Sequence, residues 1–136
     1  MKKYIGLTAL LCVLTLATQA YAVTTWSSSN CEDKGGTTVT VGTQTFCKSG
    51  AKMNWWSAYA WCEGMGGKMP TIWELCPNMP SLTNQAACGS TYSGGAWSTT
   101  PSDNNGHIWV ASSNIGSGGW KPATDTFAYC LPNGSN

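Results

Sequence analysis

Apolar residues form one continuous run near the start of the chain, and the pattern changes to shorter periodic segments after it. Residues 5–17 are almost entirely apolar, with Lys2 and Lys3 before them and the small-x-small sequence of residues 20–22 behind them. A basic start, a short apolar stretch and a small-residue cleavage site are typical of a secretory signal peptide. The run is shorter than the roughly 20 residues of a spanning helix, so we expect cleavage after Ala22 rather than a membrane anchor.

Residues 37–46 alternate β-branched and small polar side chains around Gly42. This alternation predicts a strand or a hairpin that turns at the glycine. The preceding residues, from Val23 to Asn30, are rich in serine and threonine and are expected to form a loose lead-in.

Residues 54–63 place apolar side chains at helical spacing after Asn54, a favourable N-cap, and glycines follow at positions 64, 66 and 67. The segment therefore predicts a helix, after which Met69 turns back toward the core. Thr71 and Glu74 form a capping-box pattern, which predicts a second helix that prolines 77 and 80 end quickly.

Strand patterns return in the second half of the chain, at residues 96–100, 107–111 and 126–130, with an Asn-Gly turn signal in residues 101–106. The order of elements predicts an α+β fold with two short helices and a small twisted antiparallel sheet. We divide the chain into a signal peptide (1–22), a lead-in (23–36), one domain (37–132) and a tail (133–136).

The composition of the chain argues against two classes of binding partner. After cleavage the chain has five lysines, no arginine and six acidic residues. A near-neutral surface of this kind lacks the basic patch that binds nucleic acid or an anionic membrane. We expect no nucleic-acid partner, and no membrane insertion after signal cleavage.

Six cysteines remain once Cys12 leaves with the signal peptide: Cys31, Cys47, Cys62, Cys76, Cys88 and Cys130. An even number in an exported chain predicts disulfides. The cysteines are too widely spaced for a zinc site and the chain has one histidine, His107, so we expect no metal and no cofactor.

Four residues of the first helix region, Ala58, Cys62, Gly67 and Met69, stand at the offsets of a known helix motif. With the strand patterns of residues 97–101 and 108–110 and the final sequence of residues 127–130, they resemble the C-type lectin-like fold, in its compact bacterial extracellular and adhesin-like branch. The resemblance extends over roughly residues 37–132.

The resemblance implies a disulfide between Cys62 in the helix and Cys130 in the last strand. Proximity in sequence then suggests Cys31–Cys47 and Cys76–Cys88, although six cysteines allow 15 pairings. A Cys76–Cys88 bridge is not the second bridge usual in the family.

Calcium-dependent sugar binding in that family uses Glu-Pro-Asn or Gln-Pro-Asp in a loop and Trp-Asn-Asp on a strand. Here Trp97 is followed by Ser98 and Thr99, and neither tripeptide occurs. Calcium needs several carboxylate ligands, so we expect binding without calcium. The lone His107 at a strand start and the lack of a paired-carboxylate motif lead us to expect no enzyme activity.

The eight tryptophans are the remaining signal. Large rings supply core burial in a small domain, which we expect for Trp97 and for one or two of the tryptophans in the first helix. These three helix tryptophans, at positions 55, 56 and 61, cannot all face one side. Trp120 lies in a Gly/Ser-rich loop with few expected neighbours, which favours a binding role, whereas Trp109 fits core and binding equally.

The candidate ligand-binding residues are Trp109, Trp120 and the turn residues Asp103, Asn104 and Asn105, although the Asn-Gly turn alone accounts for the last three. We expect a secreted or surface binding module for adhesion or for recognition of a glycan or an extracellular protein, with the periplasm as the other location. The alternative is a structural subunit of a surface filament or envelope assembly, which would form a homo-oligomer.

Overall fold

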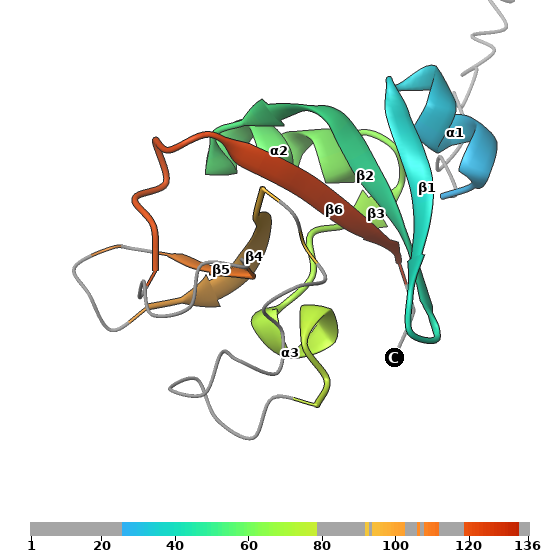
Figure 1. Ribbon diagram of the computed structural model, residues 1–136. Coiled ribbons are helices and arrows are strands. Elements are labelled where there is room, and N and C mark those ends of the chain that lie inside the picture. The colour runs from blue at the N-terminus through green and yellow to red at the C-terminus, as the bar shows by residue number, and fades with distance from the viewer. Residues whose placement is uncertain are drawn as a thin grey trace, which may run out of the picture.

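The computed structural model describes residues 26–78, 92, 94–102, 106, 108–111 and 119–133. The predicted signal peptide, Cys88, Asp103 to Asn105 and His107 lie outside these residues. The described part is an α+β fold of three helices and six strands (Figure 1). The elements are α1 (Ser28–Asp33), β1 (Gly36–Val41), β2 (Gln44–Met53), α2 (Trp55–Glu63), β3 (Gly67–Lys68), α3 (Ile72–Leu75), β4 (Ala96–Pro101), β5 (Ile108–Ala111) and β6 (Thr126–Pro132).

The strands form a mixed sheet in the order β1-β2-β6-β4-β5, and β3 also pairs with β6. The prediction of an antiparallel sheet was wrong at one position, because β4 runs parallel to β6 with Ala96 opposite Phe127. The strands β5 and β6 lie on opposite sides of β4, with β5 antiparallel and β6 parallel to it. Thr126 Oγ1 supports this pairing by donating a hydrogen bond to the Gly94 carbonyl over 2.6 Å.

The predicted hairpin is confirmed by β1 and β2, which pair from Gly36 opposite Ser49 to Val41 opposite Gln44. Gly42 has a φ of 61° in the two-residue turn, the left-handed region that tight hairpin turns require at this position. The second strand continues to Met53, beyond the predicted end, because its far half pairs with β6.

Adjacent residues of β2 and β6 point to opposite faces of the sheet, and both faces are buried. Cys47 and Cys130 lie opposite each other on one face, beside Trp97 of β4, in a cluster that includes buried residues of α2. Phe46 and Tyr129, one position earlier in each strand, belong to a second cluster with buried residues of α3. The centre of the sheet thus lies between two apolar layers, as expected from the alternation of side chains along a strand.

The two predicted helices are confirmed, and local hydrogen bonds account for where they begin. Asn54 Oδ1 accepts a hydrogen bond from the Ser57 amide over 2.9 Å at the start of α2. Thr71 and Glu74 form the expected reciprocal capping box at the start of α3. Met69 is buried, as predicted.

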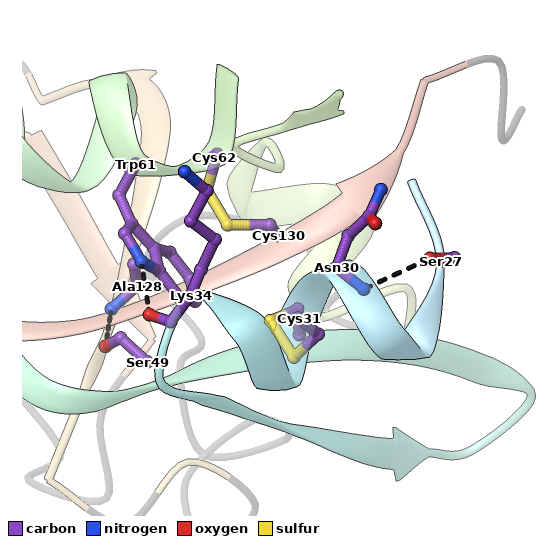
Figure 2. Close-up of a disulfide and its surroundings, with 10 residues drawn as sticks. Ser27, Asn30, Cys31, Lys34, Ser49, Trp61, Cys62, Ala128 and Cys130 are labelled. Atoms are coloured by element: carbon purple, nitrogen blue, oxygen red, sulfur yellow. Dashed lines mark hydrogen bonds between the residues drawn. A yellow bond between two sulfur atoms is a disulfide. The ribbon is translucent and has the colours of Figure 1, made fainter. Parts of the chain in front are cut away.

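A third helix, α1, replaces the loose lead-in that was expected before residue 37. Ser27 caps it by accepting a hydrogen bond from the Asn30 amide over 3.1 Å, and Cys31 is fully buried. Figure 2 shows how Trp61 of α2 reaches across to α1, where its Nε1 donates to the Lys34 carbonyl over 3.1 Å. A side-chain cap, a disulfide and this long-range bond hold a six-residue segment that has little helical pattern of its own.

The structure contains the predicted Cys31–Cys47 and Cys62–Cys130 disulfides. Cys76 is also disulfide-bonded, but its predicted partner Cys88 is outside the described residues. Disulfides fit an oxidising, extracellular type of compartment. No helix in the described residues is both long and apolar enough to cross a membrane.

We predict that removing Cys62–Cys130 destabilises the protein more than removing Cys31–Cys47. The sequence separations are 68 and 16 residues, which correspond to roughly 4 and 3 kcal/mol in the chain-entropy model. Urea unfolding of the Cys62→Ala/Cys130→Ala and Cys31→Ala/Cys47→Ala variants measures both values. The reverse order would show that loop closure does not control the stabilisation.

The ionisation of Glu74 is expected to make stability depend on pH. Burial raises the pKa of Glu74, but hydrogen bonds from Lys68 and Thr71 outweigh this effect and lower it below its ordinary value of 4.5. The stabilisation is therefore complete above about pH 4.5 and is lost as the pH falls through the lowered folded-state pKa. Thermal unfolding between neutral and acid pH should show a smaller loss of stability for Glu74→Gln than for the wild type. An identical pH dependence of stability in the two proteins would contradict this assignment.

Candidate binding surface

Three aromatic side chains at the start of α2 form a partly exposed surface, which we call the α2 aromatic face: Trp55, Trp56 and Tyr59. Trp56 is 58% exposed and Tyr59 is 41% exposed. The Trp55 ring lies between them, edge-on to Trp56 at 6.5 Å and tilted against Tyr59 at 5.5 Å between centroids. Exposed large rings in such contact present a continuous apolar surface with polar N–H and O–H groups at its margin.

Trp55 is fixed by two hydrogen bonds to other parts of the chain. Its Nε1 donates to the Ser98 carbonyl of β4 over 2.8 Å, and its backbone amide donates to the Pro122 carbonyl over 2.9 Å. The first bond orients the ring and the second holds the start of α2 against the segment before β6. The exposed rings therefore project from a fixed base, which lowers the entropy cost of binding.

A shallow, open pocket of about 300 Å³ lies on this segment before β6 and is lined by Trp120, Lys121 and Thr124, which together we call the Trp120 pocket. Trp120 is half-buried against the cluster that contains Trp97. Its backbone exchanges hydrogen bonds of 2.8 and 2.9 Å with Ile108 of β5. The expectation that Trp120 has few neighbours is thus wrong, although its side chain does line a pocket.

Gly119 allows this close approach of the two backbones. A Cβ atom at this position would lie 2.5 Å from Ser102 Cβ and 2.7 Å from the Ile108 carbonyl oxygen. Both distances are too short for any residue with a side chain, so a glycine here is what allows Trp120 to pair with β5.

The Trp120 pocket and the α2 aromatic face adjoin each other. Pro122 lies between Lys121 and Thr124 in the chain, and its carbonyl accepts the hydrogen bond from the Trp55 amide. The two features therefore combine half-buried and exposed rings with one exposed lysine and the hydroxyl groups of Tyr59 and Thr124. We refer to them together as the aromatic surface.

Trp109, the other tryptophan among the candidates, is in the core. It is 9% exposed and packs in the cluster with Phe46 and Tyr129, on the opposite face of the sheet from Trp97. The structure therefore does not bring Trp109 to the aromatic surface. The candidates Asp103, Asn104 and Asn105 lie outside the described residues.

Sequence reasoning missed Trp56 and Tyr59 as candidate binding residues. It established that the three helix tryptophans cannot all face the core, and the structure shows Trp56 exposed while Trp55 and Trp61 are partly buried. The sequence did indicate that one of these rings is exposed, because Trp56 directly follows Trp55 and lies about 100° away around the helix. Contacts with β4 decide whether Trp55 or Trp56 packs against the core, and the sequence does not reveal these contacts.

Two tyrosines with shifted pKa values, Tyr92 and Tyr129, are part of the core. Tyr92 donates a hydrogen bond to the Leu75 carbonyl over 2.7 Å, and its burial, followed by the neighbouring Tyr129, raises the pKa of its phenol. Burial also raises the pKa of Tyr129. Across the residues described, no group of three or more His, Cys, Asp or Glu side chains could hold a metal ion.

Comparison with protein-family models, with curated proteins and with solved structures finds no match to this chain.

We predict that Trp55→Phe lowers the free energy of unfolding by about 1 kcal/mol, because it keeps most of the ring but removes the hydrogen bond to Ser98. Trp56→Phe is the matched control and is expected to have almost no effect, since Trp56 is exposed. Urea unfolding of both variants tests this prediction. Equal effects would mean that the Ser98 bond does not fix the base of the aromatic surface.

Proposed function

We propose that the protein is a secreted or surface-exposed C-type lectin-like module that binds a glycan or an extracellular protein without calcium. The observation that carries this proposal is the aromatic surface, in which exposed rings adjoin a pocket on a disulfide-bonded scaffold. Rings of this kind anchor ligands by apolar contact, while nearby polar groups fix the orientation of the ligand.

The connection between α2 and β6 supports the proposed fold family. The Cys62–Cys130 bridge joins these two elements, and β2 and β6 lie side by side so that early and late parts of the domain meet (Figure 1). The resemblance implies the same helix-to-last-strand bridge. Fold likeness alone does not establish activity, so the proposal relies on the surface.

The surroundings of Trp97 support binding without calcium. Ser98 follows it, is fully buried, and donates its hydroxyl hydrogen bond to the Trp109 carbonyl over 2.7 Å. The Thr99 amide and hydroxyl both bond to the Pro70 carbonyl. Neither residue supplies the carboxylate that a calcium site needs, and their hydroxyl groups are already engaged within the fold.

The chemistry of the aromatic surface suits a sugar ring. The apolar C–H face of a pyranose can stack on an indole, while its hydroxyl groups can bond to Lys121 and Thr124. An aromatic or aliphatic side chain of a protein ligand would use the same rings. A structural subunit of a surface assembly is the second candidate function, and the uncharged edge strand β1 favours it.

We expect Trp56→Ala and Trp120→Ala to weaken ligand binding at least tenfold, because each removes a ring from the aromatic surface. Glycan arrays and immobilised extracellular-matrix proteins identify the ligand, and titration calorimetry with that ligand measures the change. The binding constant should be the same in calcium and in EDTA.

Trp73→Ala is the matched control, since Trp73 is 43% exposed on α3 and is not part of the aromatic surface. It should leave binding unchanged. Binding that disappears in EDTA, or that is lost equally in all three variants, would contradict the proposal.

A further inference from the structure

The outer edge of β1 offers unpaired backbone groups for a further strand. β1 is the terminal strand of the order β1-β2-β6-β4-β5, and none of the described strands pairs with its outer side. Figure 1 shows it at the edge of the sheet, next to α1. An edge of this kind can pair with a strand from another molecule.

The hairpin register establishes which residues face outward. In an antiparallel hairpin the residues that flank a two-residue turn form a hydrogen-bonded pair, and bonded pairs then alternate along the ladder. Val41 and Gln44 flank the turn, so Val41, Val39 and Thr37 bond to β2. The Gly50 amide donates to the Gly35 carbonyl over 3.1 Å, which agrees with this alternation, since Gly35 is two residues before Thr37. The amide and carbonyl groups of Thr38 and Thr40 therefore point away from the sheet.

The β1 strand itself has no charged residue, proline or bulge that would prevent the addition of another strand. The sequence Gly-Thr-Thr-Val-Thr-Val of β1 has no charged residue and no proline. Its register with β2 is uninterrupted over six residue pairs, so no bulge twists the edge away. Lysine, proline and bulges are the usual protection of an exposed edge.

The helix α1 packs against β1, and the disulfide that holds it lies on one face of the strand. A Cβ atom on Gly36 would lie within 3 Å of the sulfur atoms of both Cys31 and Cys47. The disulfide that holds α1 therefore lies on the face from which Gly36 and Thr38 project. Val39 and Val41 project from the opposite face, where they are half-buried against the cluster that contains Phe46.

We propose that β1 pairs with β1 of a second copy of this chain, antiparallel and with Val39 opposite Val39. In this register Thr38 of each copy faces Thr40 of the other, and each of these pairs exchanges two backbone hydrogen bonds. The two sheets join into one continuous sheet across the twofold axis, which makes the interface the same surface on both copies.

A second copy fits this edge because β1 is complementary to itself. On one face Val39 of each copy lies opposite Val39 of the other, with Val41 diagonal to it, so half-exposed valines become buried against each other. β1 brings no charged side chain to the interface, and hence no like charges face each other across it. This interface also involves no residue of the aromatic surface, so its failure and the failure of the proposed function are distinguishable.

Sedimentation velocity of the mature protein over a range of concentrations tests the association, and a dimer is the expected result. Val39→Cys should form a covalent dimer under mild oxidation, because the two Cα atoms of a non-hydrogen-bonded pair lie close together. Ala60→Cys, at an exposed position on α2, is the matched control and should remain uncrosslinked. Peptide mapping checks that the native disulfides stay intact.

Thr40→Pro removes an outward amide without breaking a backbone hydrogen bond to β2, so it should abolish the dimer, whereas Thr40→Ser, which also keeps the side-chain hydroxyl that contacts Thr45, should keep it. Thr40→Lys gives the same test by charge repulsion if the proline variant does not fold. A wild-type protein that is monomeric at all concentrations, a dimer that persists in both Thr40→Pro and Thr40→Lys, or equal crosslinking through Ala60→Cys would overturn the proposal.

Discussion

The pairing of Cys47 with Cys130 across β2 and β6 is the contact on which the rest of the domain depends. Each cysteine is fully buried and binds a different helix, so one disulfide ties down α1 and the other ties down α2 at the same place on the sheet. The Trp61 hydrogen bond to Lys34 then joins the two helices directly. Short helices that would not be stable alone are thus held by covalent bonds at the centre of one face.

Local signals were sufficient where one side chain completes a hydrogen-bond pattern within a few residues. Asn54, the Thr71–Glu74 pair and Gly42 each determine the conformation of their own segment, and the corresponding helices and hairpin were predicted. The α1 helix was missed because six residues with one buried side chain give no periodicity. The parallel pairing of β4 with β6 was missed because it joins segments about 30 residues apart, and no local pattern encodes it.

The candidate site was less predictable than the fold for the same reason. The sequence indicates that some tryptophans must be exposed, but the choice between Trp55 and Trp56 depends on whether Nε1 can reach Ser98 of a distant strand. Trp109 lies in an apolar strand between Ile108 and Val110, and only the tertiary structure shows that its side chain faces the layer that contains α3. Trp120 can be placed beside β5 only when its backbone hydrogen-bond partner, Ile108, is known.

Burial of both faces at the centre of the sheet leaves mainly its margins for interaction. The strand order places β1 at one margin and β5, with Trp120 bridged to it, at the other. A pair of chains joined through β1, as proposed, leaves the aromatic surface of each chain outside the interface. Two linked sites that engage one cell or matrix surface bind with an effective concentration set by their spacing, so avidity can exceed the affinity of either site by orders of magnitude. Under the proposed binding function and the proposed dimer, weak stacking on a shallow pocket is enough for adhesion, because the scaffold supplies the second site.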